Sequence, residues 1–122
     1  MTQITSHILD TSVGKPAEGV LITLMQQQDD DWLTLGSANT NNDGRVSDFL
    51  TAGDSETKKD KHTALAGGVY KLRFDLSDYY KKLGTDSFYP YAEVVFQIAG
   101  DGQHYHVPLL LNPFGYSTYR GS

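Results

Sequence analysis

The 122-residue sequence predicts an all-β fold, a two-sheet sandwich with one short helix. About eight short runs are rich in β-branched and aromatic residues, turn residues separate them, and one segment changes to a helical period. Strands of this number and spacing are typical of a β-sandwich. A chain of this length can bury a working core, so we expect residues 1–122 to form a single domain.

The strands are predicted from period-two alternation and from the turns between them. They cover residues 4–10, 19–26, 32–37, 45–50, 69–75, 92–99, 104–111 and 116–120. Residues 20–25 are mostly apolar on both faces, which indicates a strand in the middle of a sheet or under an oligomer contact. Asp43-Gly44 is a strong reversal signal, and it places Arg45 at one end of the sheet.

The helix is predicted over residues 76–83. Leucine and tyrosine recur there at i, i+3, i+4 and i+7, which is the spacing of one helical face. Ser77 and Asp78 suit its beginning, and Gly84 suits its end.

Composition excludes several classes of function. Ten basic residues against fifteen acidic ones give a net charge of -5, which disfavours nucleic acid or an anionic membrane as a partner. There are no cysteines for disulfides or thiolate metal sites, and no apolar run reaches the roughly 20 residues of a membrane span. The first residues do not resemble a signal peptide. We therefore expect a cytoplasmic location, or a periplasmic one if a leader was removed.

The segment from His104 onward carries an unusual set of side chains for a chain end. Alternation places His104 and His106 on one face of a strand, with Tyr105, Val107 and Leu109 on the other. The turn residues at 112–115 then predict a second strand that runs back beside the first. By contrast, residues 51–65 are polar and lack periodicity, so a solvated loop with His62 on its surface is expected.

Six side chains are candidates for chemistry: His7, Arg45, His104, His106, Tyr119 and Arg120. Their spacing leaves three interpretations open. His104 and His106 point the same way and could bind zinc with His7 as a third ligand. The same residues could instead form a metal-free acid/base site, or they could be ordinary structural residues.

Four segments of the chain resemble the transthyretin-related proteins that are 5-hydroxyisourate hydrolases. These segments are Ser6-His7-Ile8-Leu9-Asp10, Asn42-Asp43-Gly44-Arg45, His104-Tyr105-His106-Val107-Pro108-Leu109-Leu110-Leu111 and Tyr119-Arg120-Gly121-Ser122. The resemblance runs from Ile4 to Ser122. Its terminal tetrapeptide and two histidine motifs distinguish these enzymes from the hormone-carrying transthyretins.

The resemblance implies a transthyretin-like sandwich of two four-stranded sheets, with a short helix after the fifth strand. It also implies a homotetramer, a dimer of dimers, with active sites in the channel between dimers. The implied reaction belongs to urate degradation in purine metabolism. It hydrolyses 5-hydroxyisourate to 2-oxo-4-hydroxy-4-carboxy-5-ureidoimidazoline without a cofactor or a metal.

Carried over residue by residue, the resemblance makes His7, Arg45 and His106 catalytic. His7, Arg45, Tyr119 and Ser117 are expected to bind the substrate. Histidine suits general acid and base roles near neutral pH, and a guanidinium can stabilise an oxyanion. Either His7 or His106 is the expected base, and the sequence does not choose between them.

Two residues and two other functions remain as alternatives. His104 is expected at a structural or rim position. Arg120 could contact the substrate, or it could pair with an acidic neighbour or the terminal carboxylate. A transthyretin-like carrier of small aromatic ligands is the alternative function, and a metal-dependent hydrolase is a further one. Three polar site residues would suit an apolar ligand poorly, because each unpaired buried polar group costs about 1–3 kcal/mol.

Overall fold

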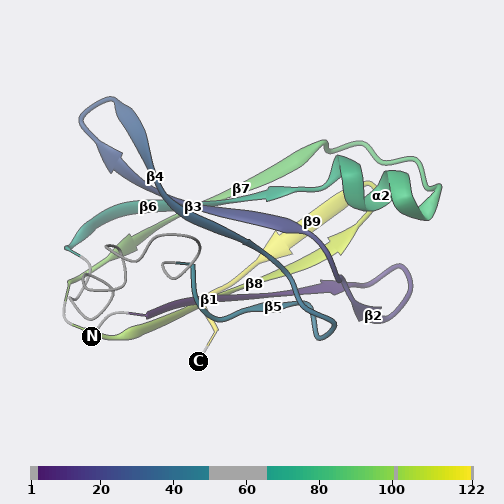
Figure 1. Cartoon of the computed structure of the whole chain (residues 1–122), viewed down its shortest axis with the longest axis horizontal. Helices are drawn as coiled ribbons and strands as arrows, with labels where there is room; N and C mark the ends of the chain where they lie inside the picture. Colours follow the sequence, from purple (N-terminus) through teal and green to yellow (C-terminus); the bar gives the residue numbers. More distant parts are fainter. Residues whose placement is uncertain (1–2, 50–65, 101, 122) are drawn as a thin grey trace.

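The described elements are the strands β1 (Gln3–Asp10), β2 (Lys15–Pro16), β3 (Leu21–Gln28), β4 (Asp31–Asn39), β5 (Arg45–Val46), β6 (Gly68–Asp75), β7 (Tyr91–Ile98), β8 (His104–Asn112) and β9 (Gly115–Thr118), and the helix α2 (Ser77–Leu83). They come from a computed structural model that describes residues 3–49, 66–100 and 102–121. One sheet has the order β4-β3-β6-β7, and the other has the order β2-β1-β8-β9, with β5 also paired to β1. Figure 1 shows the two sheets as two layers, with α2 at one end.

The predicted all-β sandwich with a short helix is confirmed, with one difference in strand number. Within the described ranges one sheet has the expected four strands, whereas the other has five. The extra strand is β2, a two-residue segment that pairs with β1 and places Pro16 opposite Leu9. The predicted strand that begins at Arg45 also pairs with β1, where Arg45 lies opposite His7. The strand expected over 45–50 ends at Val46, where polar residues follow. Leu50, the expected loop 51–65 and His62 lie outside the described residues.

Helix α2 begins and ends close to its predicted limits. Gly84 follows it with a φ of 67°, the left-handed conformation that favours glycine. The phenol of Tyr79 donates a 2.6 Å hydrogen bond to the carboxylate of Asp10, which joins the helix to the end of β1. Among the described residues, no helix is long and apolar enough to span a bilayer.

Strands β1 and β8 bring the two ends of the chain together. They pair in parallel, with Thr5 opposite His106 and His7 opposite Pro108. The inward side chains of these two strands are buried: Ile4, Ser6, Ile8, Asp10, Tyr105, Val107, Leu109 and Leu111. His104 and His106 therefore lie on the outer face, as the alternation predicts. Antiparallel β9 runs back beside β8, also as predicted.

The core fills the space between the layers. The β4-β3-β6-β7 sheet contributes Ile22, Leu24, Tyr70, Leu72, Phe74, Ala92 and Ile98 to it. Full burial of an aliphatic or aromatic side chain contributes about 1.5–3 kcal/mol, so this layer holds both sheets in place. The outer face of β1 and β8 is thereby presented as a rigid platform for polar side chains.

Candidate active site

The predicted histidines and arginine lie together on the outer face of the β1–β8 pair. His7 comes from β1, Arg45 from the adjacent β5, and His106 from β8. The sheet register sets their neighbourhood, because Arg45 lies opposite His7 and His106 lies opposite Thr5, two residues before His7. Residues far apart along the chain are thus neighbours through strand pairing.

A tight turn fixes the position of Arg45. The side-chain oxygen of Asn41 accepts hydrogen bonds from the backbone N–H groups of Asp43 at 2.9 Å and Arg45 at 3.0 Å. Gly44 has a φ of 72°, and a Cβ atom there would lie 2.5 Å from the carbonyl oxygen of Ile8. Only glycine therefore lets this turn pass so close to β1. The guanidinium follows directly and is exposed.

The ring of His106 is held along two of its edges. On one edge, the hydroxyl oxygen of Thr5 lies 2.7 Å from Nδ1. On the other, Gly121 packs so closely that a Cβ atom on it would lie 2.5 Å from Cδ2 of the ring. The Gly121 N–H also donates a 2.8 Å hydrogen bond to the His106 carbonyl. These contacts leave the edge formed by Nε2 and Cε1 available to a ligand.

His104 belongs to the same polar group. Its Nε2 lies 2.8 Å from the hydroxyl oxygen of Thr5, and its ring centroid is 6.3 Å from that of His106. His104 itself is exposed. It therefore has a rim position, as expected, but it is connected to His106 through one shared hydroxyl.

The electrostatics favour neutral imidazoles. Burial lowers the pKa of His106, and the positive charge of Arg45 lowers it further, with smaller contributions from His104 and His7. Burial and Arg45 also lower the pKa of His7, although a backbone hydrogen bond with Asp43 and the Asp43 carboxylate partly offset them. Both rings can therefore accept a proton near neutral pH.

Two cavities meet at His106. One, of about 230 Å³, is lined by Thr5, Ser6, Arg45, Val46, Ser47, His104 and His106. The other, of about 350 Å³, is lined by Val94, Val95, Phe96, Gln97, Tyr105, His106, Val107, Thr118, Tyr119 and Arg120. His106 lines both cavities, with Arg45 in the first and Tyr119 in the second.

The remaining predicted residues lie nearer the edge of this site. Tyr119 is 59% exposed and shares the second cavity with His106. Ser117 pairs with Leu110 on the exposed face of β9, and it lines neither cavity. The Arg120 guanidinium donates a 3.0 Å hydrogen bond to Gln103 and lies over the Tyr105 ring. The terminal carboxylate, one of its expected partners, lies outside the described residues.

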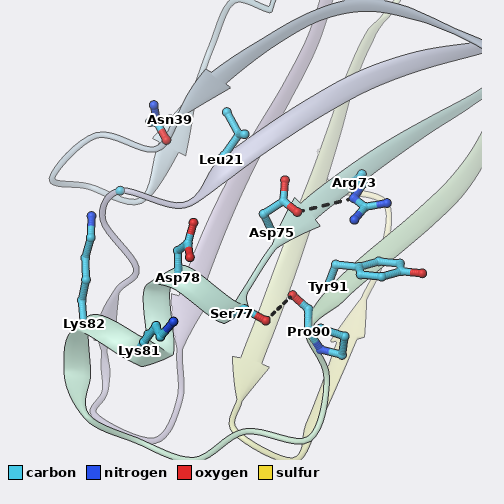
Figure 2. A pocket seen from close by; sticks show the side chains of 11 residues that line it. Leu21, Asn39, Arg73, Asp75, Ser77, Asp78, Lys81, Lys82, Pro90 and Tyr91 are labelled. Carbon is cyan, nitrogen blue, oxygen red and sulfur yellow. Dashed lines mark hydrogen bonds and ion pairs between the residues drawn. The ribbon is translucent and has the colours of Figure 1, made fainter.

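A larger hollow of about 730 Å³ lies beside α2 and contains none of the predicted site residues. Figure 2 shows several charged and polar side chains in its walls, with Arg73 directed at Asp75 and the Ser77 hydroxyl hydrogen-bonded to the Pro90 carbonyl. The Arg73 guanidinium also stacks on Tyr91 at 3.9 Å. Arg73 and Asp75 are thus paired with each other, and Asp78, Lys81 and Lys82 also line the hollow. In the described ranges, no group of three His, Cys, Asp or Glu side chains is arranged to hold a metal ion.

Sequence reasoning missed Thr5 and the close packing of Gly121. A threonine in a strand carries no functional signal, and its role depends on the parallel register that places it opposite His106. Gly121 lies in a terminal motif that the sequence does single out, but its contact with the His106 ring follows only from the folded chain.

Comparisons with known proteins bear on the family of this chain. The model of the HIUase/Transthyretin family matches residues 4–121. The 5-hydroxyisourate hydrolase of Mus musculus is 43% identical over 121 residues, which cover 98% of this chain and 94% of the relative. The solved 5-hydroxyisourate hydrolase of Klebsiella pneumoniae is 35% identical with a TM-score of 0.77, and it covers 98% of this chain and 99% of its own.

A solved transthyretin is structurally just as similar. The transthyretin of Sparus aurata is 30% identical with a TM-score of 0.81, over 97% of this chain and 95% of its own. The backbone alone therefore does not separate the two kinds of protein that share this fold. The family model and the mouse relative each match nearly the full length of this chain, so the chain is a member of the HIUase/Transthyretin family.

Proposed function

We propose that this protein hydrolyses 5-hydroxyisourate, a step of urate degradation, by metal-free opening of a cyclic amide. One observation carries the proposal: two imidazoles with lowered pKa values and one guanidinium share the outer face of the β1–β8 pair. The names of the mouse and Klebsiella relatives support the same substrate. The product is the ring-opened 2-oxo-4-hydroxy-4-carboxy-5-ureidoimidazoline.

The chemistry requires a base, an oxyanion stabiliser and an acid. A neutral histidine, His7 or His106, removes a proton from water, and the water oxygen forms a bond to the ring carbonyl carbon. Arg45 stays protonated and stabilises the negative charge that develops on the carbonyl oxygen. The C–N bond then breaks, and the protonated histidine returns its proton to the leaving nitrogen.

Substrate binding is assigned to the surrounding polar groups. Arg45 and His7 hold the carbonyl end, and the exposed phenol of Tyr119 lines the adjoining cavity of about 350 Å³. Ser117, exposed on β9, is assigned to the edge of the planar ring. The cavity of about 350 Å³ lies at the lower end of the range typical of small-molecule sites, which suits a small heterocycle. Such sites are lined mainly by apolar groups with a few polar ones.

A carrier of small aromatic ligands is the competing function, since a transthyretin shares the fold. The polar side chains argue against it. Arg45, His7 and His106 would lose water on contact with an apolar ligand, and each group left unpaired would cost about 1–3 kcal/mol.

We further propose a homotetramer, a dimer of dimers, that encloses the sites between its dimers. Strands β7 and β9 lie at the edges of their sheets, where an unpaired strand can join another chain. Large apolar side chains are exposed along these edges and the adjoining turns, namely Phe88, Val95, Phe114, Tyr116 and Tyr119. Analytical ultracentrifugation tests this assembly, which requires a species of four chains.

The activity is tested on 5-hydroxyisourate generated enzymatically from urate. The decay of its absorbance is followed without the protein, with the protein, and with the protein after treatment with a chelator. Accelerated decay that survives the chelator is the expected result. Loss of acceleration after the chelator would indicate a metal-dependent hydrolase, and no acceleration would leave the carrier.

A further inference from the structure

Thr5 lies between two imidazole rings. Its hydroxyl oxygen is 2.7 Å from Nδ1 of His106 and 2.8 Å from Nε2 of His104. The residue is only 9% exposed, so bulk water has little access to the hydroxyl. The hydroxyl therefore connects the two rings directly.

The number of protons restricts how this connection can be made. A threonine hydroxyl can donate one hydrogen bond and accept two. Among the described residues, the two rings are its hydrogen-bond partners. With both rings neutral, the hydroxyl donates to one ring and accepts from the other. If it donates to His104, then His106 carries its proton on Nδ1, and its Nε2 is free to act as a base.

The packing of His106 agrees with Nε2 as the reacting atom. Thr5 occupies the Nδ1 edge, and Gly121 covers the Cδ2 edge. The Arg45 guanidinium faces the same cavity, so an unprotonated nitrogen is favoured there over an N–H group or a cation. His104, at the other end of the connection, is exposed to solvent.

We propose that His106, Thr5 and His104 form a proton relay in which His106 is the general base and His104 the final proton acceptor. This inference rests on the proposed function, because it assigns one of the two candidate bases of that reaction. Thr5 and His104 act through His106, so they are positioning and relay residues.

Three protons move in the relay. The proton of the attacking water passes to Nε2 of His106 as the water oxygen bonds to the carbonyl carbon. The Nδ1 proton of His106 passes to the Thr5 oxygen, and the original Thr5 proton passes to Nε2 of His104. His106 and Thr5 end neutral, His104 becomes an imidazolium, and the oxyanion carries the matching negative charge. The reverse movement delivers a proton to the leaving nitrogen.

The charges around His106 give the relay its advantage. Arg45 faces it from β5, His7 from β1 and His104 from β8, while Tyr119 and Arg120 of the C-terminal tail line the adjoining cavity. A positive charge on His106 would be repelled by Arg45, whereas His104 is exposed to water.

The test uses variants that separate the hydroxyl from the fold. Thr5→Val removes the hydroxyl at nearly constant shape, Thr5→Ser keeps it, and His104→Phe removes the final acceptor. Thr11→Val is the matched control. Thr11 directly follows β1, and its hydroxyl donates a 3.0 Å hydrogen bond to the Leu111 carbonyl of β8 rather than to a histidine. The measurements are kcat and its dependence on the deuterium fraction of the solvent.

We expect Thr5→Val and His104→Phe each to lower kcat by about tenfold, within the usual range for acid–base groups. Both should change a curved dependence on deuterium fraction, typical of several protons in motion, to a linear one. Thr5→Ser, which keeps the hydroxyl, should recover most of the kcat and curvature lost in Thr5→Val, whereas Thr11→Val should leave both at the wild-type level. Wild-type kcat and curvature in Thr5→Val would overturn the relay. A loss in Thr5→Val alone, with His104→Phe unaffected, would overturn it too, because Thr5 would then only orient His106.

A measurement on the protein without substrate separates this inference from the proposed function. Long-range ¹H–¹⁵N correlation spectra distinguish protonated from unprotonated ring nitrogens. In the wild type above pH 8, His106 should carry its proton on Nδ1, and Thr5→Val should return it to the Nε2-protonated form that histidine prefers in water. A wild-type His106 protonated on Nε2 contradicts the relay whatever the activity. Absence of hydrolysis with the expected Nδ1 form contradicts the function alone.

Discussion

Strand β1 carries a polar cluster at each of its ends, and the two differ in how completely they are satisfied. Near its end, Asp10 is fully buried, and its carboxylate accepts hydrogen bonds from the Tyr79 phenol and from the backbone and hydroxyl of Ser12. Near its beginning, Thr5 and His7 lie on the outer face with His106, and Thr5 and His106 line a cavity. One cluster is closed, and the other is open to a ligand.

The contrast separates a structural polar site from a chemical one. Asp10 has donors on both oxygens and joins α2 to the sandwich, so its hydrogen-bonding capacity is used within the fold. In the ring of His106, Nδ1 is hydrogen-bonded to the Thr5 hydroxyl, whereas neither Thr5 nor Gly121 covers the edge that carries Nε2. A reacting side chain must be held in place by its neighbours and must also keep one polar atom free for the substrate. The two clusters should therefore respond to mutation in opposite ways.

The largest effect is expected for the open cluster. His106→Ala and Arg45→Ala should each lower kcat/KM by more than tenfold, within about 10²–10⁴-fold, because a proton acceptor or an oxyanion stabiliser is lost. Arg45 is exposed and His106 half-buried, so the Tm should stay within about 3 °C of the wild type. Hydrolysis assays and thermal unfolding check both parts. Near wild-type turnover in either variant would remove that residue from the site.

The closed cluster should show the reverse. Asp10→Ala should lower the free energy of unfolding by about 3 kcal/mol and the Tm by roughly 10 °C, because it leaves the Tyr79 phenol and Ser12 donors without their acceptor. Asp10→Asn is the matched control, since it keeps an acceptor oxygen and should lose less. Chemical denaturation measures the change. Below the Tm, kcat should stay at the wild-type level. A loss of kcat without a loss of stability would contradict the purely structural role of Asp10.

A smaller effect concerns pH. Because the base must be neutral, and burial together with Arg45 lowers the pKa of His7 and His106, wild-type kcat/KM should persist below the ordinary histidine pKa of 6.5. Arg45→Gln removes the positive charge, raises both pKa values and should move the acidic limb to higher pH. Arg45→Lys keeps the charge and should leave the limb near its wild-type position. Rate profiles between pH 5 and 8 measure the shift, and an unmoved limb in Arg45→Gln would show that the limb has another origin.

Local patterns predicted much of the fold because their causes are local. The alternation from His104 to Leu109 identified the inner and outer faces of β8, and the i, i+3, i+4 spacing with Gly84 located α2. The shortness of β5 was not predictable, since it depends on where the strand stops pairing with β1.

The sequence predicted which residues are candidates for the site, but not the hydrogen bonds that join them. His7, Arg45 and His106 were identified by resemblance, and pairing of strands from both chain ends brings them together. Thr5 was missed because a hydroxyl shared by two rings depends on a register that no local pattern encodes. The hydrogen bond between Asp10 and Tyr79, which lie 69 positions apart, likewise could not be predicted from a local pattern.

The parallel pairing of β1 with β8 also has a consequence for folding. Thr5 and His106 are separated by 101 positions, so their contact closes one of the longest loops in the chain, whereas β3 and β4 form from adjacent segments. Long-range pairing is slow relative to local hairpins, because chain entropy is lost before the contacts are gained. During refolding, the β-sheet signal in circular dichroism should recover before turnover does, which makes catalysis a reporter of the last strand to dock.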